Sequence, residues 1–231
     1  MKTYLSANPV LEAFGNAKTT RNNNSSRFGK FIEVHFDAKC QVVGGFISHY
    51  LLEKSRICTQ GSEERDYHVF YHICAGAPES LRQQLYITKP DDFHYLRRGC
   101  TQYFTSSQSE RQLSGIQKSK TQVERGSLHD PLLDDIKDFK NMDEALSRIG
   151  LSDKERLSIY TIVSAVLHLG NVTFEDNPED AKGGSRVCGS AEKSLSVAAS
   201  LMGVDPEELR QALVSKVMQT SRGGLKGTVI M

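Results

Sequence analysis

A polar stretch near the start of the chain, residues 22–31, contains side chains that could bind a nucleotide. It reads Asn-Asn-Asn-Ser-Ser-Arg-Phe-Gly-Lys-Phe and leads directly into an alternating run that predicts a strand. Serine hydroxyls can ligate Mg²⁺, and asparagine amides can donate to phosphate oxygens. Asn22 would then contact a phosphate, and Ser25 would place a water molecule. Ser26 would ligate the metal, and Arg27 would act as a latch with its planar fork of donors. Composition alone favours a simpler interpretation, a solvated loop ahead of an ordinary strand.

The segment before this loop predicts a short helix rather than a phosphate cradle. Asn8 is expected to cap a helix over residues 8–17 that Gly15 closes. Residues 15–19, Gly-Asn-Ala-Lys-Thr, look superficially like a phosphate loop. Ala17 stands where the second glycine of G-x-x-x-x-G-K-S/T is required, so we do not assign phosphate binding to them.

The segment after the loop predicts a hairpin. Strands are expected over residues 30–36 and 41–47, joined by a turn at 37–40. The Gly44-Gly45 pair inside the second strand suggests a bulge or a close backbone approach.

Composition limits the classes of function. The chain has 231 residues, of which 38% are hydrophobic and 25% are charged, as is typical of a soluble globular chain. A net charge of +1 provides no strong field for a nucleic acid or a membrane surface. The five cysteines form no C-x-x-C pair, which favours reduced thiols in the cytoplasm over disulfides or a zinc site.

A buried helix is expected after Ser62, with acidic residues in its first turn. Its core stripe has helical spacing and consists of Tyr67, Phe70, Tyr71 and Cys74. His68 and His72 are four residues apart and could share a metal on a helix. No third ligand lies nearby in the sequence, so we interpret both histidines as surface or packing residues.

The second half of the chain alternates polar loops with helices. Residues 105–125 are polar and predict a surface excursion. Ser152 and Glu155 form a capping box that starts a helix ending at Gly170, and a flexible loop is expected over 175–189.

Two helices are expected near the end of the chain, one closed by Gly203 and one capped by Asp205. A basic loop over residues 214–231 follows. Its cations that could steer an acidic partner are Lys216, Arg222 and Lys226. A solvated positive loop is the simpler interpretation.

Long ungapped stretches of the chain resemble the motor domain of myosins. Residues 8–19 running into 22–31 resemble the region of switch I, and the likeness continues through 50–56, 67–77, 167–171 and the stretch near Val217. Class VI, the minus-end-directed myosins, is most similar in four places: Gly44-Gly45-Phe46, residues 98–101, residues 130–135 and the ending 226–230.

The resemblance implies an α/β fold, mostly helical with part of a central twisted β-sheet, from a P-loop NTPase-type motor. It implies ATP and Mg²⁺ as cofactors, with Asn22, Ser25, Ser26 and Arg27 around the nucleotide. It places Lys216, Arg222 and Lys226 in a loop that faces F-actin, with Thr228 as a regulatory phosphorylation site. The implied parts are helix and switch I (1–31), sheet hairpin (30–47), upper actin-cleft subdomain (48–213), its insertion (105–125) and actin-facing loop (214–231).

The sequence contains neither a phosphate loop nor a D-x-x-G-F-E second switch, whose glutamate pairs with the arginine of switch I in that family. We therefore expect an interior piece of a cytoplasmic motor on the actin cytoskeleton, not catalytic alone, whose partner is the remainder of the heavy chain. Calmodulin or light chains would bind only other regions.

Two alternatives belong to other classes of protein. A kinesin-type microtubule motor also pairs Asn with Ser-Ser-Arg in its first switch, although Phe28-Gly29 after Arg27 fits myosins better. A non-catalytic scaffold that binds actin is the second alternative.

Overall fold

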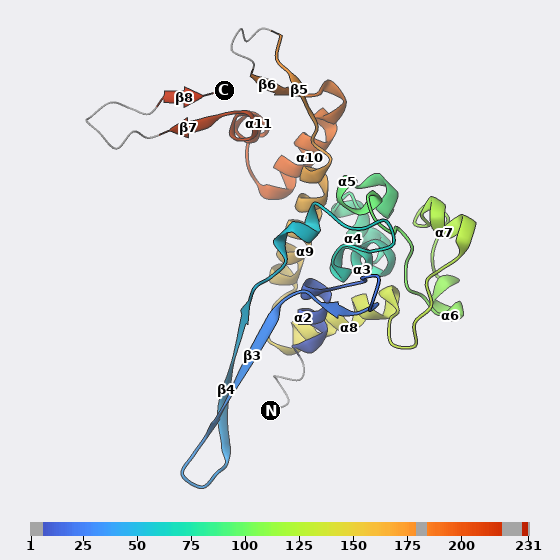
Figure 1. Ribbon diagram of the computed structural model, residues 1–231, viewed down its shortest axis with the longest axis vertical. Coiled ribbons are helices and arrows are strands. Elements are labelled where there is room, and N and C mark those ends of the chain that lie inside the picture. The colour runs from blue at the N-terminus through green and yellow to red at the C-terminus, as the bar shows by residue number, and fades with distance from the viewer. Residues whose placement is uncertain (1–6, 179–183, 219–227, 231) are drawn as a thin grey trace, which may run out of the picture. The chain divides into compact units, whose positions relative to one another are not determined.

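The computed structural model describes residues 7–178, 184–218 and 228–230. The chain forms two compact units, and the boundary between them falls after Val163, inside helix α9 (Asp153–Gly170). Figure 1 shows the order of the elements along the chain.

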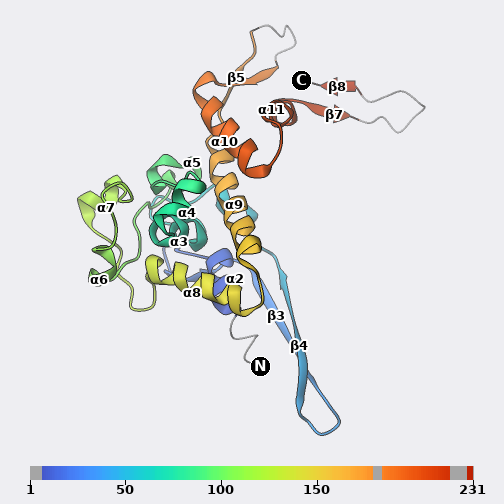
Figure 2. The ribbon, with the colours of Figure 1, turned by 180° about the vertical axis from the view of Figure 1, so that it is seen from behind.

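The first unit is built around three helices. Helix α3 (His68–Gly76) packs against α2 (Asn8–Gly15) and α8 (Asp135–Arg148), and Figures 1 and 2 show the three together from opposite sides. The predicted stripe on α3 is confirmed as core. The other elements of this unit are β1 (Asn16–Ala17), β2 (Ser25–Ser26), β3 (Gly29–Phe36), β4 (Val42–Tyr50), the 3-10 helices η1 (Lys54–Ile57) and η2 (Pro90–Asp92), and helices α4 (Glu79–Gln84), α5 (His94–Arg97), α6 (Ser107–Glu110) and α7 (Lys120–Arg125).

Helix α3 begins later than the sequence predicts. Ser62 caps no helix, and the chain reaches α3 in an extended conformation. The Arg65 N–H donates to Lys18 O, and Tyr67 forms a β-bridge with Ala17. Pairing with the end of β1 thus uses backbone groups that a helix would need for itself. Asn8 is likewise the first residue of α2 rather than its cap. Gly15 ends α2 as expected, but Asn16 and Ala17, which were predicted as helix, form strand β1.

The predicted hairpin forms, with β3 and β4 antiparallel. The Asp37 carboxylate accepts the N–H groups of Lys39 and Gln41 and so closes the turn. Opposite His35 and Phe36, the register skips Val43, so a bulge lies directly before Gly44. All named strands of the described residues pair as two-stranded sheets, so the expected part of a central sheet is present as this one hairpin.

Residues 105–125 are not a solvated excursion. They include α6 and α7, and Ser109, Ser119 and Gln122 are buried among them. The buried Gln117 amide donates to Cys74 O and Ala75 O in the last turn of α3, at 3.1 and 3.2 Å. The absence of an apolar period misled the prediction, because here polar side chains satisfy buried backbone carbonyls.

The second unit has a small apolar core of its own, formed by Val172, Val187, Ala191, Leu195, Ala198, Ala199 and Leu209. Its elements after α9 are β5 (Phe174–Asp176), β6 (Ser185–Val187), the 3-10 helix η3 (Gly189–Ala191), α10 (Glu192–Met202), α11 (Pro206–Val214), β7 (Lys216–Met218) and β8 (Thr228–Ile230).

Local signals in the second half of the sequence predicted the helix ends well. Ser152 and Glu155 form the capping box of α9, Gly203 closes α10 in the left-handed region at φ 70°, and Asp205 caps α11. Part of the expected loop over 175–189 is instead strand, because β5 ends at Asp176 and pairs antiparallel with β6 over residues 185–187. Among the described helices, none combines the length and hydropathy needed to cross a membrane.

The contact of α3 with α8 predicts a sensitive position at Gly76. A Cβ there would collide with the Cβ of Phe139 and come within 3.0 Å of Ile136 O. We expect Gly76→Ala to lower the free energy of unfolding by about 1–3 kcal/mol in urea titrations, because two packed helices must separate. Gly115→Ala is the control, since a Cβ there meets nothing within 4 Å, and it should change stability by about 0.5 kcal/mol or less. Equal effects of the two substitutions would contradict this account.

Candidate functional site

The polar loop is closed by short backbone pairing. Strand β1 pairs with β2, with Asn16 opposite Ser26, and the Arg27 N–H donates to Gly15 O at 2.8 Å. Asn22 shapes the tip, because its carbonyl accepts the Thr19 N–H and its side-chain oxygen accepts the Asn24 N–H at 2.8 Å. The loop therefore has a defined conformation.

The structure brings two of the predicted residues into direct contact. An Arg27 terminal nitrogen donates to Ser25 Oγ at 3.1 Å. Ser26 is exposed, and its hydroxyl donates its one hydrogen to Phe28 O at 3.2 Å. The lone pairs of that hydroxyl oxygen stay available to a metal ion. Asn22 is also exposed, and none of these four residues lines the cavity between α2, α3 and α8 that is described below.

Glu53 is a partner of Arg27 that the sequence analysis missed. Its carboxylate accepts Arg27 Nε at 2.6 Å and Arg56 Nε at 2.7 Å. Burial alone would raise the pKa of Glu53, but the hydrogen bonds from Arg27 and Arg56 outweigh it and lower that pKa. Only proximity in the fold reveals this pair, since 26 residues separate Arg27 from Glu53.

Two asparagines attach the loop to the rest of the unit. Asn24 Oδ1 accepts Asn16 Nδ2 at 3.0 Å and lies 3.2 Å from His68 Nε2, and its amide donates to Glu12 at 3.3 Å. The Asn23 amide donates to Asp130 at 2.9 Å. These residues were not predicted as functional, and their role here is to hold the loop.

A buried ion pair lies behind Asn24. Both terminal nitrogens of Arg65 donate to Asp135 at 2.8 Å, and both side chains are almost fully buried. Arg65 also donates to Gln102 O at 3.2 Å and stacks on Tyr71, 3.8 Å from the ring centroid. The Phe104 N–H donates to Asp135 at 2.7 Å. Dense hydrogen bonding of this kind is what a buried charge pair requires.

The two histidines of α3 belong to this cluster and are neutral. His68 Nδ1 lies 3.2 Å from Arg65, which can only donate, so Nδ1 accepts and Nε2–H donates to Asn24. Burial lowers the pKa of His72 to about 4, a change that Asp135 opposes and Arg65 reinforces. Burial, Arg65 and His72 together hold the pKa of His68 well below its usual value.

His68, His72 and Asp135 have ligand atoms within 4.8 Å of one another, close enough to hold a metal. The sequence analysis found no carboxylate for the histidines, because Asp135 is distant in the chain. Of its two interpretations, surface or packing residues, burial favours packing. Arg65 nevertheless occupies both carboxylate oxygens of Asp135. Because a guanidinium already supplies the positive charge, the cluster does not fit a metal ion.

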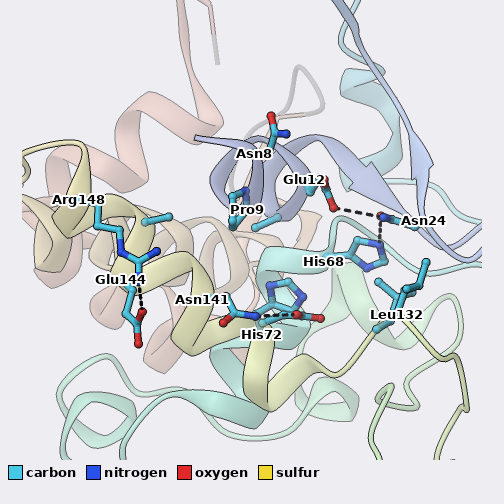
Figure 3. Close-up of a pocket in the computed structure, with 14 residues that line it drawn as sticks. Asn8, Pro9, Glu12, Asn24, His68, His72, Leu132, Asn141, Glu144 and Arg148 are labelled. Carbon is cyan, nitrogen blue, oxygen red and sulfur yellow. Dashed lines mark hydrogen bonds and ion pairs between the residues drawn. The ribbon is translucent and has the colours of Figure 1, made fainter. Parts of the chain in front are cut away.

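A cavity of about 670 Å³ lies between α2, α3 and α8. Figure 3 shows the side chains that line it, among them Asn24, His68 and His72, and Asn141, Glu144 and Arg148 of α8. The loop thus contributes Asn24 to this cavity.

The structure describes only part of the basic end of the chain. Lys216 begins β7 and Thr228 begins β8, which pair antiparallel, but the structure does not describe their side chains. Arg222 and Lys226 lie outside the described residues.

Residues 1–230 match the family described as myosin head (motor domain), and the chain belongs to this family. It is 64% identical over 227 residues to Myosin heavy chain 95F of Drosophila melanogaster, a match over 98% of this chain and 18% of that protein. It is 54% identical over 224 residues to Unconventional myosin-VI of Homo sapiens, over 97% of this chain and 17% of that protein. Identity to Myosin-I heavy chain of Dictyostelium discoideum is 41% over 207 residues, or 90% of this chain and 8% of that protein.

The chain therefore spans less than a fifth of the length of these relatives. The resemblance to myosins is confirmed, and the kinesin alternative is not supported.

The buried ion pair gives a prediction about stability. Asp135→Asn leaves the Arg65 guanidinium buried without a counter-charge, and we expect it to lower the free energy of unfolding by about 3–5 kcal/mol. Glu144→Gln removes an exposed ion pair with Arg148 and should cost about 0.3–0.5 kcal/mol. Urea titration of both variants measures the difference, and a loss below about 1 kcal/mol for Asp135→Asn would refute the assigned role.

The histidine assignment gives a prediction about protonation. At pH 6 we expect the ¹⁵N shifts of His68 and His72 to show neutral rings with the proton on Nε2, because burial disfavours the charged form. His72 should gain a proton only near pH 4. A protonated ring for either residue at pH 6 would rule out the hydrogen-bond directions given above.

Proposed function

We propose that the chain is part of an actin-based motor of class VI type, which couples Mg·ATP hydrolysis to movement along F-actin. Membership of the myosin head family supports the motor, and 54% identity to Unconventional myosin-VI supports the class. In this proposal residues 22–27 are switch I, which senses the terminal phosphate of ATP. The remainder of the heavy chain would supply the phosphate loop and the second switch.

The observation that best supports the assignment of switch I is the hydrogen bonding of the Arg27 guanidinium. Glu53 binds its Nε and Ser25 binds one terminal nitrogen, while its second terminal nitrogen has no hydrogen bond among the described residues. The side chain is therefore oriented on one side and open on the other. A carboxylate from another part of the heavy chain can pair there without displacing Glu53.

The other loop residues suit the same role. The exposed Ser26 hydroxyl oxygen can ligate Mg²⁺, and the exposed Asn22 amide can donate to a phosphate oxygen. Ser25, held by Arg27, would place the attacking water. Asn23 and Asn24 fix the base of the loop, so loss of the phosphate would release only its exposed face.

Hairpin β3–β4 supports the view that this chain forms part of a larger fold. Its apolar side chains are about half exposed on both faces, with Phe31, Val34, Phe36, Val43 and Phe46 among them. A two-stranded ribbon with two apolar faces is not stable in water by itself. We infer that further strands of the complete protein extend this hairpin into a sheet.

For the end of the chain we propose contact with actin. The positive charges that would attract the acidic surface of actin are those of Lys216, Arg222 and Lys226. A phosphate on Thr228 would add negative charge and weaken this attraction. The upper-cleft assignment of residues 48–213 belongs to the same proposal.

The test uses the complete protein that carries this chain. We expect Ser26→Ala and Arg27→Ala each to lower its actin-activated ATPase by about 100-fold or more, because both groups act on the transferred phosphate or its magnesium. Ser107→Ala, at an exposed position on α6, is the matched control and should leave the rate unchanged. Cosedimentation with F-actin, and with microtubules for comparison, measures the partner.

Unchanged ATPase activity in both loop variants would contradict the assignment of switch I to residues 22–27. F-actin binding without any ATPase in the unmodified protein would favour the scaffold alternative.

A further inference from the structure

The sequence contains a pattern that basophilic protein kinases recognise, an arginine three residues before a serine or threonine. Acidic groups in the peptide groove of such a kinase pair with the arginine and so place the hydroxyl at the active site. The pattern occurs three times, as Arg56 with Thr59, Arg98 with Thr101, and Arg111 with Ser114. A kinase must reach both side chains of a pair, so the structure can separate the three.

Two of the three pairs are inaccessible. Arg56 is 4% exposed, and its guanidinium already donates to the carboxylates of Glu53 and Glu64. It has no donor group facing solvent that a kinase groove could bind. Thr101 is 5% exposed, so its hydroxyl lies inside the fold rather than on the surface.

The third pair is accessible. Arg111 and Ser114 are both exposed and lie between α6 and α7, where residues 111–119 contain no helix or strand. The Arg111 guanidinium has no hydrogen bond or ion pair within the described part of the chain. Leu113 is buried, so a kinase must open the segment locally, and an irregular surface segment opens more readily than a helix.

We propose that Ser114 is a phosphorylation site for a basophilic serine/threonine kinase. Ser114 Oγ attacks the γ-phosphorus of the Mg·ATP that the kinase holds. The bond from this phosphorus to the β–γ bridging oxygen breaks, and ADP leaves with the electron pair. The hydroxyl proton passes to the catalytic base of the kinase. The site does not depend on the proposed motor function, because the kinase recognises only this surface segment.

The Ser114 hydroxyl makes a contact that a phosphate would break. Its Oγ and its backbone N–H both donate to Gln117 Oε1, at 2.9 and 3.0 Å. The amide nitrogen of Gln117 donates to the carbonyls of Cys74 and Ala75 at the end of α3. A phosphorylated Oγ has no proton to donate, and the phosphate brings a charge of about −1.5 to −2 close to an acceptor oxygen. Phosphorylation therefore separates Ser114 from Gln117 and loosens the attachment of this segment to α3.

Phosphorylation of the complete protein that carries this chain tests the site. The probe is Mg·ATP with the isolated kinase domain of calmodulin-dependent protein kinase II, which prefers an arginine at this spacing. We expect tandem mass spectrometry to find the phosphate on Ser114, and Arg111→Gln to lower the rate there about tenfold or more, because the paired charge is lost. Both positions are exposed, so the variant should fold.

Thr59→Ala is the matched control. It removes an exposed hydroxyl that follows a buried arginine, so the rate of Ser114 phosphorylation should not change. An unphosphorylated Ser114, or a rate at Ser114 that Arg111→Gln leaves unchanged, would overturn the proposal. Faster phosphorylation of Thr59 or Thr101 than of Ser114 would do the same.

Hydrogen–deuterium exchange of the same protein, before and after phosphorylation, measures the structural effect. The Ser114 N–H donates to Gln117 Oε1, and the Gln117 N–H donates to Ser114 O at 3.1 Å. We expect peptides that cover residues 112–118 to exchange several-fold faster once Ser114 carries a phosphate. Peptides from α11 are the control and should exchange at the same rate in both forms. Unchanged exchange over residues 112–118 would overturn the proposed loss of the Gln117 contact.

Discussion

The buried pair of Arg65 and Asp135 is the interaction on which the first unit depends. Two opposite charges are removed from water here. The Asp135 carboxylate accepts both terminal nitrogens of Arg65 and the Phe104 N–H, whereas Arg65 Nε has no hydrogen-bond partner in the described part of the chain. Asp135 is the first residue of α8, where its negative charge also interacts favourably with the helix dipole. Arg65 precedes α3, so the pair joins two of the three central helices at one point. Its geometry must be accurate, because a small displacement would leave a charge unpaired in a medium of low dielectric.

The conformation of the loop follows from this pair. Arg65 fixes the tautomer of His68, and His68 then donates to Asn24, which also binds Asn16 and Glu12. The base of the loop is therefore set by a chain of hydrogen bonds that starts at a buried charge. The exposed residues of the loop can change partners while its base stays in place. A loop that responds to a ligand needs such a division between a fixed base and a free face.

The sequence allowed good prediction of features that depend on neighbouring residues. The turn at Asp37 and the capping box at Ser152 involve groups within five positions of each other, so their residue types specify them. Features that depend on distant residues were missed. The pairing of Glu53 with Arg27 and of Asp135 with His72 leaves no signal at short spacing. The buried polar side chains of residues 105–125 were missed for the opposite reason, since polarity alone indicates solvent exposure.

The hairpin and the three-helix core show two different kinds of stability in one chain. The core satisfies its own charges and buries its own aromatic rings, as the enclosed Tyr71 and Phe104 illustrate. Backbone pairing joins the two strands of the hairpin on both sides of the bulge at Val43, but its side chains gain little burial from this pairing. Backbone pairing fixes the register of the hairpin. Its apolar faces remain about half exposed, so burying them against other parts of the protein would stabilise it further. It follows that contacts made by these faces can change the free energy of the hairpin without changing its register. The hairpin begins at Gly29, which is only two positions from Arg27 of the loop.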